Sequence, residues 1–406
     1  MAQIDLQKAK MGKNDEFYTM YEDIQREVNA YLEYDPNVFK DKTVLLPCDD
    51  PEWSNFTKYF AANFERLGLK KLISTSFATE SKMSYCGIQL SFDDFLTDYE
   101  KTSPQYDETL SNTKGKIFTL SRKSKKKVDI DALEWKYLDG SGDFRSDEVK
   151  ALRDEADIIV TNPPFSLFRE FVAWLFETPK QFLIIGNQNA ITYKEIFPLI
   201  MENKMWIGCR FNQRINGENM KFRVPDSYPM TGTEVETDSN GIKYISVAGT
   251  GWFTNLDHGR RHQPLELMTM KDNLKYNKEL LTKLKKDYNT NTYPVYDNYD
   301  ALEVPVTMGI PSDYDGVMGV PISFLPKYCP EQFEIIGSDA YDGTPPTKKY
   351  SNKVKVVNGE RMKSLTGTMG CVIKTEDYGS GTYFDVGYPV KAVYKRLFIR
   401  RKGGTQ

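Results

Sequence analysis

The stretch from Asp157 to Phe165 constrains the fold of this chain more than any other part of the sequence. Its first half, Asp157–Thr161, is apolar and β-branched, which predicts a buried strand. Its second half is Asn162-Pro163-Pro164-Phe165. Proline has no amide to give to a sheet ladder, and it moves the preceding residue out of the α region. The strand must therefore end at about Asn162 and continue into a stiff loop.

A helix is expected directly after this loop. Ser166 is placed to cap it. The helix itself is indicated by apolar residues at helical spacing, namely Phe168, Phe171, Val172 and Leu175. In open α/β sheets, ligands bind at the carboxyl ends of the strands. The pattern of strand, rigid polar loop and helix therefore predicts a ligand site at Asn162–Phe165.

The side chains of the loop suit the binding of an amino group. Asn162 has a side-chain carbonyl, and the backbone carbonyl of Pro163 has no amide nearby to satisfy it. Two such acceptors can bind both hydrogens of an exocyclic –NH2 group and stabilise the positive charge that grows on its nitrogen. Phe165 adds a face on which a planar base can stack. These features favour methylation of an amino group on a flipped base, although Asn-Pro-Pro also marks ordinary turns.

The run Thr161–Glu170 resembles the EcoRI-type DNA adenine-N6 methyltransferases. Within it, Asn-Pro-Pro-Phe is similar to the catalytic motif of amino-methyltransferases that use S-adenosylmethionine. The resemblance implies a site-specific enzyme that transfers a methyl group from S-adenosylmethionine to the N6 amino group of a flipped adenine in duplex DNA. It implies catalytic roles for Asn162, Pro163, Pro164 and Phe165.

A second strand, loop and helix lies nearer the start of the chain. Val44–Leu46 is predicted as the first core strand and Pro47–Trp53 as its loop, and a helix is expected from a Ser54 cap to Gly68. A doubly wound domain binds nucleotide-like ligands here. Pro47-Cys48-Asp49-Asp50 replaces the usual glycine-rich loop, which disfavours a dinucleotide oxidoreductase. S-adenosylmethionine has no pyrophosphate, and Asp49 or Asp50 can bind its α-amino group.

Two further segments resemble cofactor-binding motifs of the family. Asp-Glu-Phe-Tyr-Thr, at 15–19, resembles the segment that covers the methionine end of the cofactor, and Gly-Asp-Phe, at 142–144, resembles the segment that binds its adenine. The second strand, Lys71–Ser74, lacks the acid that many relatives use to hold the ribose. We expect cofactor contacts from Tyr18, Thr19, Pro47, Cys48, Asp49, Asp50, Asn55, Phe56, Asp143 and Phe144.

The strands after the loop complete the sheet. Gln181–Gly186 is predicted as a buried strand. Tyr244–Val247 and Gly251–Leu256 are predicted as an antiparallel pair that closes the sheet, with Trp252 and Phe253 in the core. Residues 1–258 are therefore expected to form an α/β domain with a doubly wound, mostly parallel sheet, the S-adenosylmethionine-binding catalytic methyltransferase domain.

The chain changes character from about Gly259. Residues from Arg260 onward carry 22 Lys and Arg against 17 Asp and Glu, a net charge of +5 in a chain whose net charge is −3. Lys271–Lys286 is predicted as a basic helix, and short strands such as Arg396–Arg401 alternate with turns. Phe324–Glu334 also resembles the EcoRI-type family. We expect residues 259–406 to form a mixed α/β DNA target-recognition region, with Lys and Arg on phosphates.

Composition excludes several other classes of protein. The N-terminus has no secretory pattern, and no run of about 18 apolar residues exists, so we expect a cytoplasmic protein without a membrane span. The five scattered cysteines indicate reduced thiols, neither a disulfide framework nor a zinc site. His258 and His262 lack an acidic or cysteine partner in the sequence, so we expect surface residues and no metal.

Two alternatives remain open from the sequence. An amino-methyltransferase acting on RNA or on a protein glutamine shares the Asn-Pro-Pro-aromatic motif. A non-catalytic DNA-binding relative is compatible with the atypical Pro47–Asp50 loop. For the favoured function, double-stranded DNA is the expected partner, and a cognate restriction endonuclease is a candidate one. We expect the protein to act as a monomer.

Overall fold

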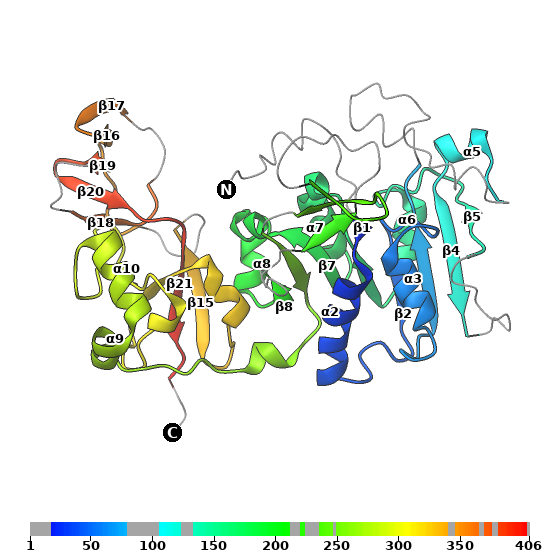
Figure 1. Cartoon of the computed structure of the whole chain (residues 1–406), viewed down its shortest axis with the longest axis horizontal. Coiled ribbons are helices and arrows are strands. Elements are labelled where there is room, and N and C mark those ends of the chain that lie inside the picture. The colour runs from blue at the N-terminus through cyan, green and yellow to red at the C-terminus, as the bar shows by residue number, and fades with distance from the viewer. Residues whose placement is uncertain are drawn as a thin grey trace. The chain divides into compact units, whose positions relative to one another are not determined.

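The computed structural model describes residues 18–78, 105–122, 133–211, 220–223, 235–246, 249–339, 346–364, 369–375 and 381–403 (Figure 1). The chain divides into two compact units. The first contains Met1–Ala190 and Met205–Gly259, and the second contains Ile191–Lys204 and Arg260–Gln406. The segment Ile191–Lys204, which we assigned to the catalytic part, thus groups with the C-terminal residues. We describe each unit by itself.

An eight-stranded sheet is the centre of the first unit, with the order β5-β4-β3-β2-β6-β7-β12-β8 in the described part of the chain. The four central strands, β3, β2, β6 and β7, are parallel, and the outer strands are antiparallel to their neighbours. This confirms the predicted α/β sheet. The strands are β2 (Thr43–Leu46), β3 (Lys71–Thr75), β4 (Lys116–Ser121), β5 (Lys136–Tyr137), β6 (Ile158–Thr161), β7 (Gln181–Asn187), β8 (Trp206–Phe211) and β12 (Thr250–Thr254).

The central strands are buried on both faces, as their continuous apolar sequences predict. On one face, alternate residues of β2 and β6 join a core with α2 and α3. Strand β6 ends at Thr161, as the prolines predicted. The helices of this unit are α2 (Tyr21–Tyr34), α3 (Asn55–Ala62), α5 (Glu108–Thr113), α6 (Asp147–Glu155) and α7 (Phe168–Phe176), with the 3-10 helix η3 (Phe165–Leu167). The 3-10 helix η4 (Gln188–Thr192) has residues of both units.

Two helix boundaries differ from the predictions. Ser54 caps α3, because its Oγ accepts from the Phe56 amide at 3.1 Å, but α3 ends at Ala62 and the chain continues to Gly68 in turns. Phe64 and Leu67 are still buried, so their apolar character reflects packing of the turns rather than a longer helix. Ser166 does not cap α7, because it lies within η3.

The predicted antiparallel pair at the end of the first unit is wrong. Strand β12 pairs with β7 and β8, whereas the strand containing Tyr244 belongs to a separate sheet of order β1-β9-β11-β10. Periodicity shows that a segment is a strand and does not identify its partner. Trp252 and Phe253 are fully buried, which confirms them as core residues. The strands of the small sheet are β1 (Tyr18–Thr19), β9 (Lys221–Arg223), β10 (Val235–Thr237) and β11 (Lys243–Ser246).

The second unit contains two sheets, of orders β13-β14-β21-β15 and β17-β16-β19-β20-β18 in its described residues. The predicted basic helix is two helices, because Asn277 ends α9 and its side chain caps α10, accepting from the Leu280 amide at 3.1 Å. The elements are α8 (Phe197–Met201), η5 (Gly259–His262, at the junction), α9 (Met270–Tyr276), α10 (Lys278–Tyr288), β13 (Leu302–Glu303), η6 (Thr307–Gly309), β14 (Met318–Pro321), η7 (Ile322–Lys327), β15 (Phe333–Ser338), β16 (Val354–Val357), β17 (Glu360–Ser364), β18 (Val372–Lys374), β19 (Thr382–Asp385), β20 (Pro389–Ala392) and β21 (Arg396–Arg401).

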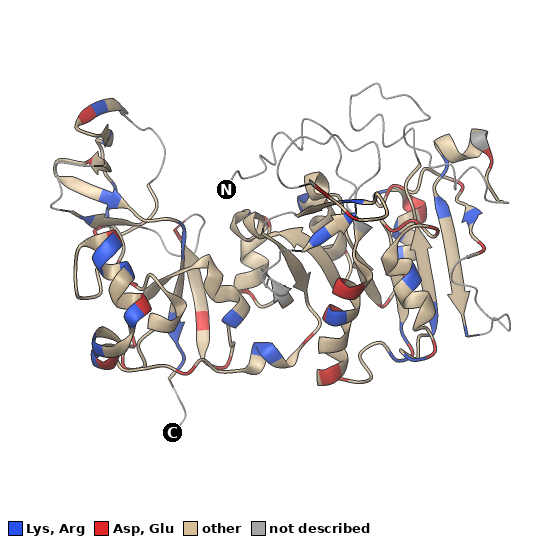
Figure 2. Ribbon diagram, viewed as in Figure 1, with Lys and Arg blue, Asp and Glu red and all other residues tan. Residues whose placement is uncertain are grey.

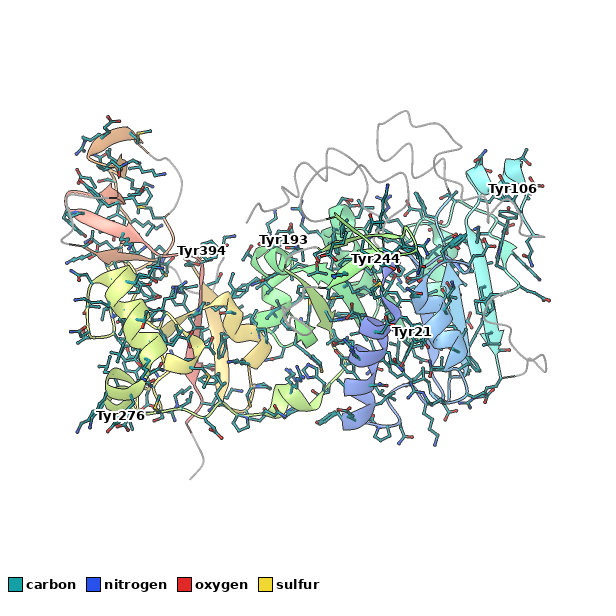
Figure 3. All side chains as sticks on the ribbon, in the orientation of Figure 1. Tyr21, Tyr106, Tyr193, Tyr244, Tyr276 and Tyr394 are labelled. Atoms are coloured by element: carbon teal, nitrogen blue, oxygen red, sulfur yellow. The ribbon has the colours of Figure 1, made fainter. Side chains whose placement is uncertain are left out.

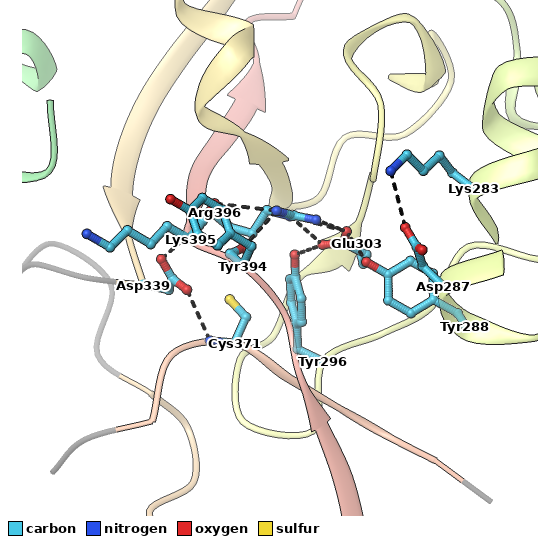
Figure 4. Close-up of polar contacts among 10 residues, drawn as sticks. All are labelled: Lys283, Asp287, Tyr288, Tyr296, Glu303, Asp339, Cys371, Tyr394, Lys395 and Arg396. Atoms are coloured by element: carbon cyan, nitrogen blue, oxygen red, sulfur yellow. Dashed lines mark hydrogen bonds and ion pairs between the residues drawn. The ribbon is translucent and has the colours of Figure 1, made fainter. Parts of the chain in front are cut away.

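A buried ion pair joins two strands of the second unit (Figure 4). Glu303 of β13 is fully buried, and Arg396 of β21 donates to both of its oxygens, with Nη2 2.7 Å from Oε1 and Nε 3.0 Å from Oε2. The hydroxyl of Tyr288 donates to Oε1 at 2.8 Å, and the hydroxyl of Tyr296 donates to Oε2. The guanidinium of Arg396 and the two tyrosine hydroxyls therefore compensate the buried charge of Glu303.

The surface of the second unit mixes basic and acidic side chains, as α9 and α10 show in Figure 2. Among its described aromatic residues, Tyr276 and Tyr394 are the most exposed, and Figure 3 labels both. No helix in the described ranges has the length and apolar character that crossing a membrane requires.

Candidate active site

Parallel strands bring the two predicted loops of the first unit to one edge of the sheet. Leu46 pairs in register with Ser74, and β2 also pairs with β6, so β2, β3 and β6 end close to one another. Thr161 pairs with Ile184 of β7, which continues to Asn187. The loop after β2 begins at Pro47, and the loop after β6 begins at Asn162. The structure therefore places the predicted cofactor loop and the predicted catalytic loop at the same carboxyl edge.

Asp49 connects these two loops. Its carboxylate accepts from the Ser54 hydroxyl at 2.7 Å on Oδ1 and from the Thr161 hydroxyl at 2.6 Å on Oδ2. Ser54 caps α3, and Thr161 is the last residue of β6, immediately before Asn162. Asp49 is only 5% exposed. This link cannot be read from residue spacing, because Asp49 and Thr161 are 112 residues apart.

Burial changes the acid–base behaviour of this loop. Removal from water raises the pKa of Asp49 to about 7, although the hydrogen bonds from Thr161 and Ser54 act in the opposite direction. Burial, and then the charge of Asp49, raise the pKa of the neighbouring Cys48 thiol. Cys48 is therefore a neutral thiol at physiological pH and not an activated nucleophile.

The catalytic loop is short and partly enclosed. Pro163 is buried, whereas Asn162, Pro164 and Phe165 are half-buried, so the loop has both an anchored and an accessible side. The ring of Phe165 packs against the edge of the hydrophobic core. The Leu167 amide donates to the Pro164 carbonyl at 3.0 Å and closes the turn into η3. The far end of the loop is thus held both by the packing of Phe165 and by the turn into η3.

The other predicted acid of the cofactor loop has a different environment. Asp50 accepts from the Glu52 amide at 2.9 Å, and its second oxygen lies 3.3 Å from the ammonium of Lys116. Lys116 also donates to the Glu52 carboxylate at 2.6 Å and lies over the ring of Trp135. Lys116 is the first residue of β4, Trp135 immediately precedes β5, and Glu52 lies in the cofactor loop itself. Sequence reasoning missed Lys116 and Glu52, since neither belongs to a motif.

The N-terminal strand lies beside the cofactor loop. Of the predicted motif at 15–19, Asp15, Glu16 and Phe17 lie outside the described residues, and Tyr18 and Thr19 form β1, paired with β9. The Asn55 side chain donates to the Thr19 carbonyl at 2.8 Å, which joins β1 to the start of α3.

Phe56 and Pro47, two more predicted contacts, have structural partners. The ring of Phe56 is buried with its edge against Trp252, with ring centres 5.8 Å apart. The Pro47 carbonyl accepts from the Thr75 hydroxyl at 3.1 Å. Their contacts with a cofactor stay predictions.

Asp143 and Phe144, the predicted adenine-binding pair, both have partners within the protein. Asp143 accepts from Arg145 through its amide, Nε and Nη2, at 2.6–2.9 Å. Burial acts to raise the pKa of Asp143, but these hydrogen bonds outweigh it and hold the pKa below its ordinary value. Phe144 is buried, with its ring against Phe171 and Trp174 of α7. Both roles toward adenine stay predictions.

The site has features that suit a polar ligand. Thr19 is 3% exposed, and its hydroxyl has no hydrogen-bond partner among the described residues. A buried hydroxyl without a partner costs free energy, which a ligand with a polar group recovers. The carbonyl of the same residue accepts from Asn55, the first residue of α3. The residues present therefore fit a methyl donor that carries charged and hydroxyl groups.

One prediction outside the site is wrong. His258 is buried, not on the surface, with Nε2 3.0 Å from the Ile207 carbonyl and its ring against the edge of Tyr31. His262 is half-buried and lies 2.8 Å from the Glu331 carboxylate. The pairing with Glu331 is invisible in the sequence because 69 residues separate the two.

Comparison with known proteins identifies the family. The family model described as adenine-specific methyltransferase EcoRI matches residues 5–402. The chain is 44% identical to the type II methyltransferase M.EcoRI of Escherichia coli, over 82% of this chain and 88% of that protein. It is 35% identical to the type II methyltransferase M.MpnI of Mycoplasma pneumoniae, over 81% of this chain and 84% of that protein.

A third relative has a similar name. The chain is 35% identical to the type II methyltransferase M.MgeORF184P of Mycoplasma genitalium, over 81% of this chain and 84% of that protein. No solved structure matches the chain significantly. The family description and the relatives' names give no support to an RNA enzyme, a protein-glutamine enzyme or a non-catalytic relative. The chain therefore belongs to the EcoRI family of adenine-specific methyltransferases, and it is a site-specific DNA adenine methyltransferase.

Proposed function

We propose that this enzyme methylates the N6 amino group of an adenine flipped out of duplex DNA, and that Asn162, Pro163, Pro164 and Phe165 form its catalytic loop. The observation that carries the proposal is the position of this loop. It follows β6 at the carboxyl edge of a parallel sheet, where it meets the loop after β2. In sheets of this type, ligands bind at this edge.

The proposed chemistry depends on two acceptors. The adenine amino group donates one hydrogen to the Asn162 side-chain oxygen and the other to the Pro163 carbonyl. These bonds orient the nitrogen lone pair and stabilise the positive charge that develops on the nitrogen. Phe165 is half-buried and supplies the stacking face for the base. The extra proton leaves to water, because the amino nitrogen is strongly acidic once it is methylated and charged.

We propose S-adenosylmethionine as the methyl donor, which when bound supplies an electrophilic methyl group. The residues that would hold it lie in the cofactor loop or beside it: Tyr18, Thr19, Pro47, Cys48, Asp50, Asn55, Phe56, Asp143 and Phe144, with Asp49 as the residue that fixes the loop. Support comes from the buried Thr19 hydroxyl, which has no partner in the described part of the chain. Asp143 also supports it, because its low pKa makes it a carboxylate acceptor at physiological pH.

We assign target recognition to residues 259–406. Their net charge of +5 contrasts with −3 for the whole chain, and phosphate contacts contribute much of the affinity of DNA-binding proteins. Double-stranded DNA is the proposed macromolecular partner, with a cognate restriction endonuclease as a candidate second one. A monomer acting in the cytoplasm is the simplest arrangement for this function.

The test is methyl transfer from labelled S-adenosylmethionine to unmethylated duplex DNA. We expect label in N6-methyladenine, and we expect Asn162→Ala to lower the rate at least about 100-fold, since a lost charge-stabilising contact has this effect in other active sites. Asn37→Ala is the matched control, because Asn37 is exposed in a turn before β2, at the opposite edge of the sheet.

Each negative result has its own meaning. Donor binding without label in DNA would exclude the DNA substrate and direct the search to RNA and protein. Absence of donor binding in the wild-type protein would exclude S-adenosylmethionine. Full activity of the Asn162→Ala variant would exclude the proposed role of the loop.

A further inference from the structure

We infer that Asp49 is a positioning residue, which fixes the catalytic loop by binding the Thr161 hydroxyl rather than by binding the methyl donor through its carboxylate. This inference rests on the proposed role of Asn162. It differs from the sequence-based expectation that the Asp49 side chain binds the donor's amino group. The different role follows from the hydrogen-bond partners that the Asp49 carboxylate has in the structure.

Both oxygens of the Asp49 carboxylate are bound within the protein. Oδ1 accepts from Ser54 at 2.7 Å, and Oδ2 accepts from Thr161 at 2.6 Å. Only 5% of the residue is exposed, so an incoming ammonium group has little access to the lone pairs that these two hydroxyls leave open. A competing hydrogen bond would also weaken the two buried bonds that are already formed, which costs free energy.

The backbone of Asp49 is fixed as firmly as its side chain. Its amide donates to the Thr75 carbonyl at 3.0 Å, and its carbonyl accepts from the Ser74 hydroxyl at 2.5 Å. Ser74 in turn shares a hydrogen bond of 2.6 Å with Thr57 of α3. Asp49 is therefore attached to β3 by its main chain and cannot easily follow a movement of its partners.

Thr161 transmits this rigidity to the catalytic loop. It is fully buried, it is the last residue of β6, and Asn162 is the next residue in the chain. A fixed Thr161 side chain limits rotation of the backbone at the point where the loop begins. The acceptor positions of Asn162 and Pro163 depend on that backbone, and displacement of a reacting group by about 1 Å can lower a rate 100-fold.

A network of buried hydroxyls can also serve stability alone, and the chain contains a control for this possibility. Thr57 is fully buried, like Thr161, and its hydroxyl belongs to the same network. It lies in α3, with no bond to the catalytic loop. Thr57→Val and Thr161→Val make the same chemical change, with the same shape retained, at two ends of one network.

The experiment compares single-turnover rates of methyl transfer for the full-length wild-type protein, Thr161→Val, Thr161→Ser and Thr57→Val, with S-adenosylmethionine affinity and melting temperature measured for each. We expect Thr161→Val to lower the single-turnover rate about 10- to 100-fold while donor affinity stays within about twofold. Thr161→Ser keeps the hydroxyl and should restore most of the rate. Thr57→Val should lower the melting temperature similarly and leave the rate within about twofold.

A double-variant cycle with Asp49→Asn tests the link directly. If Asp49 acts on the rate through Thr161, the rate of Asp49→Asn/Thr161→Val should be much higher than the product of the two single effects predicts. Independent, multiplicative effects would overturn the inference. A Thr161→Val variant with the same single-turnover rate as Thr57→Val would also overturn it, whether or not the donor affinities of the two variants differ. A wild-type protein that labels no DNA would instead refute the proposed function.

Discussion

Asp49 carries a buried carboxyl group, and the protonation of this group is therefore coupled to folding. Its pKa is about 7 in the folded protein because burial disfavours the charged form. In an unfolded chain, an aspartate has a pKa of about 3.9. At pH values between these two pKa values, Asp49 is therefore largely protonated in the folded state and largely ionised in the unfolded state.

The sign of the resulting pH dependence follows from linkage. Because the folded state holds more protons, the free energy of unfolding should fall as pH rises from about 4 to about 7, and this contribution should be constant above about 7. The Asp49→Asn variant lacks this titration. From pH 5 to pH 8, its free energy of unfolding should therefore rise relative to wild type, by about 2 kcal/mol. Urea denaturation at the two pH values measures the change.

Asp143→Asn is the control for this prediction. The Asp143 pKa is depressed, so its contribution to stability is present above the unfolded pKa and is lost only as pH falls through the folded pKa. That variant should show the same difference from wild type at pH 5 and at pH 8. If the difference in free energy of unfolding between Asp49→Asn and wild type were also the same at the two pH values, Asp49 would have to be ionised in the folded protein at both.

At the scale of elements, the structure depends on side chains that join strands distant in the sequence. In the second unit, β13 and β21 flank β14, and Glu303 and Arg396 join them across 93 residues of sequence. Asn277 acts more locally, since it ends α9 and caps α10. Both kinds of contact determine boundaries that hydrophobic periodicity does not reveal.

Removal of one member of the buried pair should destabilise the second unit strongly. Arg396→Met leaves the Glu303 carboxylate buried without its cation, and breaking such pairs costs about 3–5 kcal/mol. We expect a loss of this size in the denaturation transition of the second unit, measured in the full-length chain.

The double variant Glu303→Gln/Arg396→Met should recover much of this loss, because no unpaired charge then remains. A loss below about 1 kcal/mol for Arg396→Met alone would show that Tyr288 and Tyr296 suffice to stabilise the carboxylate.

At the scale of the whole molecule, charge is distributed unevenly along the chain. The residues from Arg260 onward have a net charge of +5, and the chain as a whole has −3. In the second unit, Lys283, Lys327 and Lys391 line a cavity of about 660 Å³, together with the acidic residues Glu279 and Asp287. Lysines in such a position can bind phosphates, which makes DNA affinity dependent on salt.

We expect the triple variant Lys283→Gln/Lys327→Gln/Lys391→Gln to weaken binding to target and non-target duplexes alike. The slope of log affinity against log salt concentration should decrease in magnitude by about 2 to 3, because each lost phosphate contact contributes about 0.9. Lys40→Gln is the control, since Lys40 is exposed before β2, at the edge of the sheet opposite the site. An unchanged slope would exclude the three lysines from the DNA interface.

The sequence by itself determined the parts of this protein that depend on local chemistry. Proline geometry predicted that the strand ends at about Asn162, and β6 ends at Thr161. Continuous apolar runs predicted the buried central strands. The run Thr161–Glu170 indicated the family that the comparisons show. These features could be predicted because each depends on residues that are neighbours in the chain.

Only the tertiary structure decided which distant residues meet. It paired β12 with β8 rather than with the strand of Tyr244, buried His258, and placed Lys116 between Asp50 and Glu52. It also showed that the Asp49 carboxylate binds Thr161, 112 residues away. Hydrogen bonds of this kind leave no periodic signal in a sequence, because they depend on how the strands are ordered in the sheet and not on residue spacing.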